Sequence, residues 1–139
     1  MKNCHRVIIS IASNYGQEEN LLRAHECLEQ VLAHCHYTDS IWTEPITSRP
    51  SAATRCPKRL YLNQLVEAET GLTADELQRR LKAIERQLGR TAADRSEGIV
   101  RIDLDLLLHG DRRYHADDWP RPYVQRLIGQ TTLEAEGGR

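Results

Sequence analysis

The sequence lacks a CxxC pair, because its four cysteines (Cys4, Cys27, Cys35 and Cys56) stand apart from one another. Cys27 and Cys35 lie among histidines, but without the paired ligand spacing of a structural zinc site, so we expect free thiols. No apolar run approaches the length that crosses a membrane, and the run near the N-terminus is too short for a signal peptide. These absences predict a cytoplasmic protein with reduced cysteines and no membrane contact.

Repeats, low-complexity segments and interdomain linkers are also absent, so nothing in the chain of 139 residues indicates a second domain. The chain is 40% hydrophobic and 28% charged, as is ordinary for a soluble globular protein. Its net charge of −1 conceals a basic run between Arg79 and Arg113 that surrounds an acidic segment. This arrangement suits a polyanionic ligand that is held partly through metal, although solvated helix faces have a similar composition.

The hydrophobic pattern predicts the order β-α-β-β-α-β. Asn14 is the expected N-cap of the first helix, with Gln17 as its capping-box partner, and the segment from Thr73 to Glu76 is the capping box of the second. Gly89 is the expected end of that second helix. The predicted elements are a strand at 7–12, a helix at 17–36, strands at 37–44 and 60–66, a helix at 73–88, a strand at 99–110 and a short helix at 123–128.

This order predicts an α+β, ferredoxin-like fold. In that arrangement a four-stranded, mainly antiparallel sheet carries two helices on one face. Here a short C-terminal tail follows the last strand. We expect a single domain over residues 1–128 and a flexible tail over residues 129–139.

The segment from Ile99 to Gly110 carries the pattern that points to chemistry. Arg101, Asp103 and Asp105 share one parity, so a strand would place them on one face and the aliphatic residues on the other. Two neighbouring carboxylates repel each other unless a cation lies between them, and Mg²⁺ binds carboxylate oxygens together with phosphate oxygens. The pattern is compatible with a phosphoryl-transfer site that holds two metal ions. Taken alone, however, it favours the alternative, an exposed strand with an incidental charged face.

This segment resembles the RTxDLDxLLxG signature of the 6-hydroxymethyl-7,8-dihydropterin pyrophosphokinase family. Further segments resemble that family's motifs in the family's order, and together they cover residues 7–126. They are Ile11–Asn14 (a GSN turn), Trp42–Pro45 (YxTxP), Tyr61–Asn63 (YLN) and Ile84–Arg90 (IExxxGR). The fold of that family is also ferredoxin-like, in agreement with the order of elements.

The resemblance implies an enzyme that transfers pyrophosphate from ATP to the hydroxymethyl group of a dihydropterin and releases AMP, in folate biosynthesis. It implies two Mg²⁺ ions, ATP and a dihydropterin as ligands, no nucleic acid or membrane partner, and a monomer or weak homodimer. The reaction needs mainly alignment and charge neutralisation. The matched residues are Asp103 and Asp105 for metal; Arg90, Arg101, Asp103 and Asp105 for catalysis; Glu85, Arg90, Arg95, Arg101, Leu106, Arg121 and Arg126 for nucleotide; and Thr43, Pro45, Tyr61 and Asn63 for the pterin.

The sequence departs from the family's pattern at several places. Ala12 stands where the family usually has glycine, Arg121 replaces a phosphate-contacting histidine, no aromatic residue follows Arg126, and the loop at 96–98 lacks the family's tryptophan. A second hypothesis is therefore a diverged paralogue that binds Mg-nucleotide without the pterin reaction. A third and weaker one is an RNA-binding ferredoxin-like domain, whose phosphate contacts the acidic face would oppose unless metal intervenes.

Overall fold

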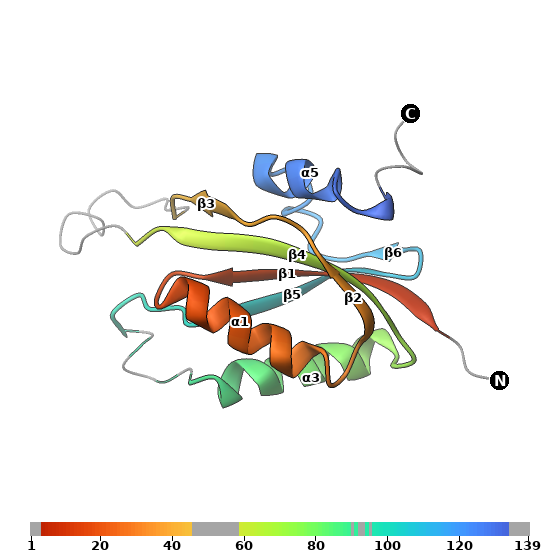
Figure 1. Cartoon of the computed structure of the whole chain (residues 1–139), viewed down its shortest axis with the longest axis horizontal. Helices are drawn as coiled ribbons and strands as arrows, with labels where there is room; N and C mark the ends of the chain where they lie inside the picture. Colours follow the sequence, from red (N-terminus) through yellow and green to blue (C-terminus); the bar gives the residue numbers. More distant parts are fainter. Residues whose placement is uncertain (1–3, 46–58, 90, 92–93, 95, 134–139) are drawn as a thin grey trace.

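The computed structural model of the chain describes residues 4–45, 59–89, 91, 94 and 96–133. These residues form an α+β structure around a six-stranded antiparallel sheet with the strand order β2-β4-β1-β5-β6, in which β3 also pairs with β4 (Figure 1). The elements are β1 (His5–Ser13), α1 (Gln17–Leu28), β2 (Ala33–Tyr37), β3 (Ile41–Thr43), β4 (Tyr61–Thr70), α3 (Ala74–Gln87), β5 (Asp103–His109), β6 (Arg112–Arg113) and α5 (Pro122–Ile128). The α+β class is confirmed.

The expected four-stranded sheet is wrong, because it has six strands. One cause is β2, which forms mostly within the stretch predicted as helix and ends before Thr38, whereas β3 lies within the strand predicted at 37–44. The Thr38 hydroxyl accepts a hydrogen bond from the Leu65 amide at 3.0 Å, so a side chain replaces a backbone group in the ladder. The other cause is the turn at Gly110 (φ +63°), which folds the two residues of β6 back onto β5.

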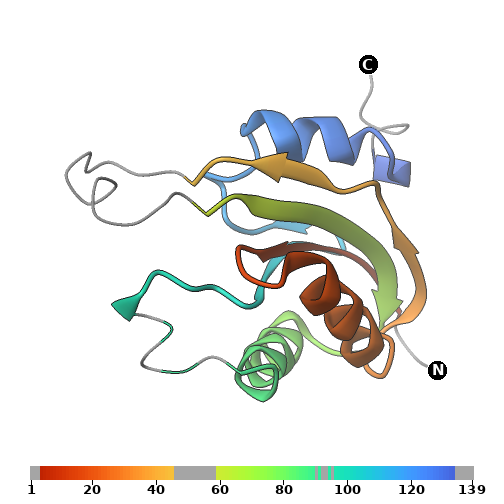
Figure 2. The ribbon, with the colours of Figure 1, turned by 60° about the vertical axis from the view of Figure 1, so that its left-hand side comes forward.

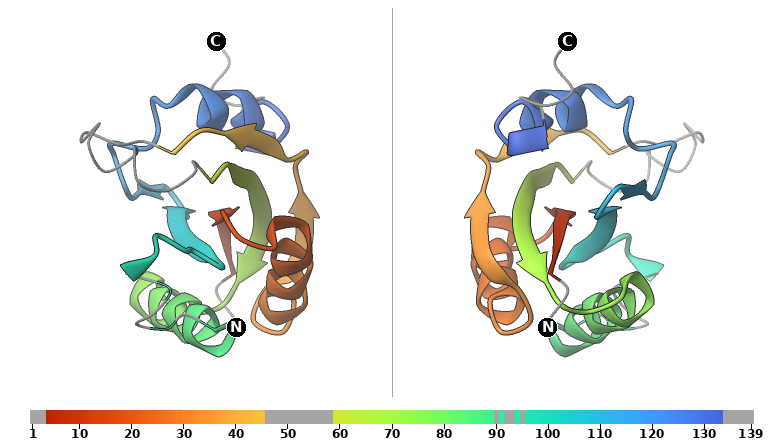
Figure 3. Two further views of the ribbon diagram at one scale, coloured as in Figure 1. Left: turned by 90° about the vertical axis from the view of Figure 1, so that its left-hand side faces the viewer. Right: turned by 90° about the vertical axis from the view of Figure 1, so that its right-hand side faces the viewer.

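The sheet has a helical layer on each side. Helices α1 and α3 lie side by side against one face, as expected, and α5 lies against the opposite face, as both end views show (Figure 3). We call the first face the helix-pair face and the second the α5 face. The helix-pair face buries Val7, Ile9 and Ile11 of β1 with the apolar stripes of α1 and α3, whereas the α5 face buries Ile8 with residues of α5. Strand β1 is therefore apolar on both faces, which explains its continuous apolar run.

Strand β5 keeps the predicted alternation only over its first half. Leu104 and Leu106 enter the core of the helix-pair face, so Asp103 and Asp105 point to the α5 face. A bulge then interrupts the ladder, because Ile9 pairs with Leu106 and Ile8 pairs with Leu108. The extra residue, Leu107, packs with Leu108 in the core under α5. The bulge thus changes which side of the strand is apolar at the point where α5 begins to cover it.

The first helix is shorter than predicted: it ends at Leu28 rather than at residue 36, and β2 begins at Ala33. The helical spacing of apolar residues continues past Leu28, but those residues meet the core from a strand instead. Val31 and Cys35 pack against the core of the helix-pair face after a turn in which the Val31 amide bonds the Leu28 carbonyl at 3.0 Å. Burial of the same side chains is compatible with either structure, so the periodicity alone did not locate the helix end.

The predicted cap of this helix is also wrong, whereas that of the second is right. Gly16, with φ +54°, is the N-cap residue of α1, and no side chain caps it. Thr73 and Glu76 form the predicted capping box at the start of α3. None of the helices in the described part of the chain has the length and apolar character needed to span a membrane.

Candidate functional site

A cavity of about 370 Å³ opens on the α5 face, at the end of the sheet where β1 finishes and β3, β4 and β5 begin or end. We call it the aspartate cavity. The four residues predicted to bind the pterin, both predicted metal ligands and Arg121 border it. Its lining is Ala12, Thr43, Glu44, Pro45, Tyr61, Asn63, Asp103, Asp105, Asp118, Arg121 and Tyr123.

Strand register explains why residues so distant in sequence line one cavity. Ala12 on β1 lies opposite Asn63 on β4 and opposite Asp103 on β5, so these three form one row across the sheet. The next row on the same face places Ser10 opposite Asp105. Strand β3 then lies beside β4 and below α5, so that Thr43 closes the side of the cavity (Figure 2). Neighbouring side chains on one face of a sheet lie close enough to contact a common ligand.

The aspartate pair is electrostatically unfavourable without a cation. Burial and, second to it, the charge of Asp103, two residues away on the same face, together raise the pKa of Asp105 to about 6. His115 partly compensates, since its Nε2 lies 3.8 Å from Asp105 Oδ1. Carboxylates that repel each other in a partly dry site attract a divalent cation, and hard cations such as Mg²⁺ prefer oxygen ligands. The donor set of this cavity therefore fits Mg²⁺.

Asn63 fixes the opposite wall of the cavity. Its buried side-chain amide donates to Thr43 Oγ1 at 2.8 Å and to the Ile41 carbonyl at 3.0 Å, which ties β3 to β4. A buried polar group that is bonded on two sides has little freedom to move. Thr43 and Tyr61, which pair across these strands, are thereby held at the edge of the cavity.

Arg121 brings a cation to the same cavity from the start of α5. Its Nε lies 3.0 Å from Asp118 Oδ1, which makes an ion pair. The geometry is not that of a hydrogen bond, however, and this buried N–H has no hydrogen-bond acceptor among the described residues. A buried donor without an acceptor is costly, so an anionic ligand would satisfy it.

The comparisons with known proteins decide the family. The family model of 7,8-dihydro-6-hydroxymethylpterin-pyrophosphokinase matches residues 8–129. This chain belongs to that family. It is 32% identical over 127 residues to the mitochondrial folate synthesis bifunctional protein of Pisum sativum, and the aligned segment covers 85% of this chain and 23% of that protein. It is 30% identical over 130 residues to the folate synthesis bifunctional protein of Chlamydia trachomatis serovar D, and the aligned segment covers 91% of this chain and 28% of that protein.

The chain thus spans about a quarter of the length of these two bifunctional relatives. Membership of the pyrophosphokinase family agrees with the resemblance seen in the sequence, and the matched segment includes every described residue of the aspartate cavity. The matched residues nevertheless do not all lie at that cavity.

Two residues that the pyrophosphokinase resemblance assigns to the nucleotide lie on the other side of the sheet. Leu106 is buried in the core of the helix-pair face. Glu85 is buried on α3, where its Oε2 accepts a hydrogen bond from the Leu104 amide at 2.7 Å. Because β6 pairs only with the far end of β5, Glu85 supplies an acceptor to a backbone group at the open edge of β5. The structure gives Glu85 a structural partner.

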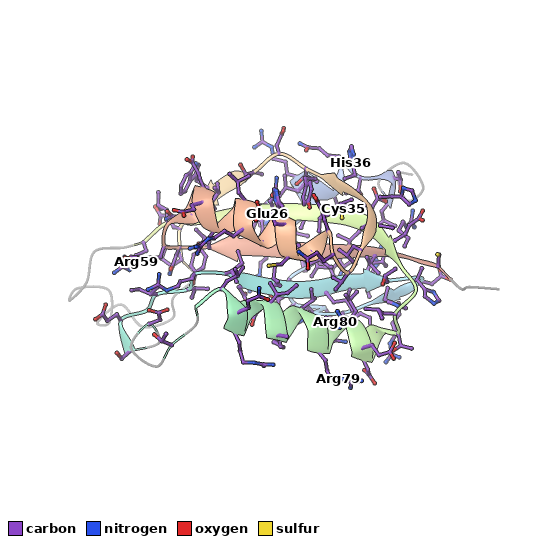
Figure 4. All side chains as sticks on the ribbon, turned by 60° about the horizontal axis from the view of Figure 1, so that its bottom comes forward. Glu26, Cys35, His36, Arg59, Arg79 and Arg80 are labelled. Carbon is purple, nitrogen blue, oxygen red and sulfur yellow. The ribbon has the colours of Figure 1, made fainter. Side chains whose placement is uncertain are left out.

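The cationic residues are spread more widely than the sequence predicts. Arg126 is exposed and borders a neighbouring cavity of about 380 Å³, which it shares with Arg121 and Tyr123. Arg79 and Arg80 are exposed on α3 (Figure 4), which covers the helix-pair face, whereas the aspartate pair points to the α5 face. Arg90 and Arg95 lie outside the described residues, and their roles stay predictions.

Arg101 does not share a face with the aspartates. Strand β5 begins at Asp103, so Arg101 lies in the bend before it and not in the alternating strand. Its guanidinium donates to Asp94, and it borders a cavity on the side of α1 and α3 rather than the aspartate cavity. Its predicted contact with the triphosphate stays a prediction.

Sequence reasoning missed four residues of the site: Glu44, which lines the cavity between two predicted residues, and Asp118, Tyr123 and His115. Asp118 and Tyr123 line the aspartate cavity, and His115 is near Asp105. Asp118 and His115 come from the segment between β6 and α5, whose sequence has no strand or helix periodicity that would predict its position. Tyr123 lies in α5, which was predicted as a helix, but the sequence does not show that this helix packs beside the cavity. Tyr123 supplies the cavity with an aromatic side chain, which the sequence comparison expected after Arg126.

Proposed function

We propose that this chain binds MgATP and a dihydropterin at the aspartate cavity and transfers pyrophosphate from ATP to the hydroxymethyl group of the dihydropterin, releasing AMP. The observation that carries the proposal is the convergence of Asp103 and Asp105 with Asn63, Thr43 and Tyr61 in one cavity. Membership of the pyrophosphokinase family supports the same reaction class. Within this proposal the β2-β4-β1-β5 part of the sheet, with α1 and α3, is the ferredoxin-like core.

The reaction balances as a single displacement. The hydroxyl oxygen of the pterin forms a bond to the β-phosphorus of ATP, the bond between that phosphorus and the bridging oxygen to the α-phosphate breaks, and AMP leaves with that oxygen. The hydroxyl proton passes to solvent. Such a transfer needs in-line alignment and neutralisation of the phosphate charges more than covalent help from the protein.

Asp103 and Asp105 would hold Mg²⁺ by their carboxylate oxygens. The described residues bring no third acidic, histidine or cysteine ligand to this pair, so phosphate oxygens and water would complete the coordination. Bound Mg²⁺ would neutralise the phosphate charges and orient the triphosphate. We propose two such ions, as the family resemblance implies.

Arg121 would bind phosphate oxygens by the N–H that lacks an acceptor. Arginine binds phosphate in a bidentate manner and stays protonated at neutral pH, so it can stabilise charge but cannot transfer a proton. Arg90, Arg95 and Arg126 are further nucleotide contacts in this proposal.

Asn63, Thr43 and Pro45 would form one wall of the pterin site, since they border the cavity at β3 and β4. Tyr61 and Tyr123 also border it, and aromatic side chains bind flat heterocycles by stacking. Burial raises the pKa of Tyr123, so its ring stays neutral at physiological pH. We therefore include Tyr123 in the proposed pterin site.

A second candidate is the diverged paralogue that binds Mg-nucleotide without the pterin reaction. Its specific support is Ala12, whose methyl group borders the cavity between Asn63 and Asp103, where the family's usual glycine would leave more space. No observation on the described residues favours the RNA-binding hypothesis.

The test is AMP release by purified protein with Mg²⁺ and ATP, with and without 6-hydroxymethyl-7,8-dihydropterin. The proposed function predicts AMP formation that needs both substrates and is lost in Asp103→Asn. The second candidate predicts calorimetric binding of a non-hydrolysable MgATP analogue with no AMP at any pterin concentration. Asp111→Asn is the matched control, because Asp111 is exposed in the turn before β6 and distant from the cavity.

A further inference from the structure

Arg101 makes a two-point ion pair with a buried carboxylate. Its Nε donates to Asp94 Oδ2 at 2.7 Å and its Nη2 donates to Asp94 Oδ1 at 3.2 Å. Asp94 is only 4% exposed, and the guanidinium lowers the pKa of its carboxyl group. Paired N–H···O bonds between a guanidinium and a carboxylate are among the stronger and more directional contacts in proteins.

The surroundings of Arg101 keep this pair in place. The guanidinium carbon lies 4.7 Å from the centre of the Tyr15 ring, at the turn that precedes α1. On its other side is Gly89, at the end of α3, where an added Cβ would come within 3.3 Å of Arg101 Cδ. Gly89 also has φ +109°, a conformation that residues with a side chain rarely adopt. The absence of a side chain at Gly89 thus leaves space for the Arg101 side chain.

The same segment is fixed to β1 at a second place. The buried Asn14 side chain donates to the Gly98 carbonyl at 2.8 Å and accepts from the Val100 amide at 2.6 Å. The Asn14 amide also donates to the Val100 carbonyl at 2.9 Å. Asn14, which fails as a helix cap, therefore continues the hydrogen bonding of β1 to the chain that leads into β5.

We propose that Arg101 is a positioning residue that acts on Asp103 through the chain, and not a ligand of the triphosphate. By pairing with Asp94 and packing on Tyr15 it holds the segment ahead of β5, two residues before the aspartate. A guanidinium that turned to a nucleotide in the aspartate cavity would leave the buried Asp94 carboxylate without its cation, which is strongly unfavourable. The proposal rests on the proposed function, because it assumes that Asp103 and Asp105 bind metal.

Metal binding in the absence of nucleotide separates a positioning role from a phosphate contact. The experiment titrates Mn²⁺ into the full chain, followed by water-proton relaxation, for wild type, Asp94→Asn, Arg101→Gln and the double variant. By charge alone, loss of Arg101 would strengthen Mn²⁺ binding and loss of Asp94 would weaken it. Positioning predicts the same sign for both: about three- to tenfold weaker Mn²⁺ binding in each single variant, and no further loss in the double variant.

Two further variants distinguish a positioning effect on Mn²⁺ affinity from a general loss of folded protein. Arg101→Lys keeps the charge and one hydrogen bond, and it is expected to recover part of the Mn²⁺ affinity. Arg23→Gln is the matched control, since Arg23 borders the same cavity as Arg101 and its loss changes the charge equally. It is expected to bind Mn²⁺ as wild type does.

Mn²⁺ affinity in Arg101→Gln that equals or exceeds that of wild type, together with a raised KM for MgATP, would overturn the proposal and assign Arg101 to the phosphates. Equal weakening in Arg23→Gln would overturn it too, because the effect would then not be specific to the pair of Arg101 and Asp94. Failure of the proposed function has a different signature. In that case Asp103→Asn would bind Mn²⁺ as well as wild type, whatever Arg101 does.

Discussion

On the helix-pair face, β5 contributes Leu104 and Leu106 to an apolar core, whereas on the α5 face the same strand contributes Asp103 and Asp105 to a cavity. The charged residues that do lie toward α1 and α3 have partners within the protein: Glu85 binds the Leu104 amide and Arg101 binds Asp94. The aspartates instead have each other as neighbours, and burial followed by the charge of Asp103 raises the pKa of Asp105. The charged groups on one face of the strand are therefore compensated within the protein, whereas a cation would compensate those on the other face.

This difference distinguishes residues that stabilise the fold from residues whose charges suit the binding of a ligand. Satisfied polar groups and dense apolar packing contribute to the free energy of folding. Uncompensated charges in a cavity reduce that free energy and are expected where a ligand supplies the compensation. The two faces should consequently respond in opposite ways to substitution.

The largest expected effect is the loss of activity in Asp103→Asn. Metal coordination stabilises charge in phosphoryl transfer by several kcal/mol, so we expect kcat/KM to fall by about a thousandfold. Stability should be unchanged or higher, because the substitution removes the repulsion with Asp105. AMP release and urea unfolding measure the two quantities, and Asp111→Asn should alter neither. If Asp103→Asn instead lost stability and kept its activity, the two faces of β5 would not differ in the way described.

The converse is expected from Leu81→Ala on α3. Leu81 is 1% exposed in the core of the helix-pair face, and truncation of a buried leucine costs about 2–5 kcal/mol of unfolding free energy. Activity per folded molecule should stay within about twofold of wild type, because the cavity is on the other face. Urea unfolding and AMP release at a temperature below both melting transitions test this. Leu22→Ala, at an exposed position of α1, is the control for substitution on a helix.

The third expected effect is a dependence of stability on pH that comes from Asp105. Its pKa is about 6 in the folded chain and 3.8 in the unfolded reference, so the folded state binds the proton more tightly. The extra stability is fully present below the unfolded pKa and is lost as pH rises through 6. The difference in pKa corresponds to about 3 kcal/mol at most, and solvent screening of this partly exposed carboxylate reduces it. Urea midpoints of the metal-free protein should therefore fall between about pH 4 and 6.

Asp105→Asn should flatten that slope, and saturating Mg²⁺ should raise stability near pH 7, where the pair is ionised. Glu97→Gln is the control, since Glu97 is exposed and outside the cavity. A slope that persists in Asp105→Asn would assign the proton uptake to another group.

The parts of this comparison that the sequence predicts are those that depend on residues close together along the chain. The alternation from Ile102 to Leu106 placed the aspartates and the leucines on opposite faces, because side-chain direction in a strand follows local geometry. The capping box at Thr73 is likewise local, and it was predicted correctly. The motif segments were predicted to share a site, and strand register brings Ala12, Asn63 and Asp103 into one row.

The errors arose where tertiary contacts decided between local alternatives. Val31 and Cys35 have the spacing of a helix, but they pack, partly buried, against the core from a turn and a strand. Arg101 has the parity of the aspartates but precedes β5, because its bond to Asp94 turns it toward α1 and α3. Tyr123 and Asp118 line the cavity, beside which α5 packs on Leu107 at the bulge. No periodicity in the sequence predicts where α5 packs.

Glu85 gives the smallest effect and the sharpest test of the division between faces, since the resemblance assigns it to the nucleotide while the structure places its carboxylate on the Leu104 amide. Glu85→Leu removes the acceptor and leaves a buried N–H unsatisfied, at a cost of about 1–3 kcal/mol in unfolding free energy. Glu85→Gln keeps an acceptor oxygen and should cost less. If Glu85 acts only through its hydrogen bond to the Leu104 amide, KM for MgATP stays within about twofold of wild type in both variants, because neither changes the aspartate cavity.

A KM that rises in Glu85→Gln, with stability close to wild type, would show that the negative charge of Glu85 acts on the nucleotide through the sheet. The strict division between a stabilising face and a reacting face would then have to be given up at this residue, and the open edge of β5 would become part of the site.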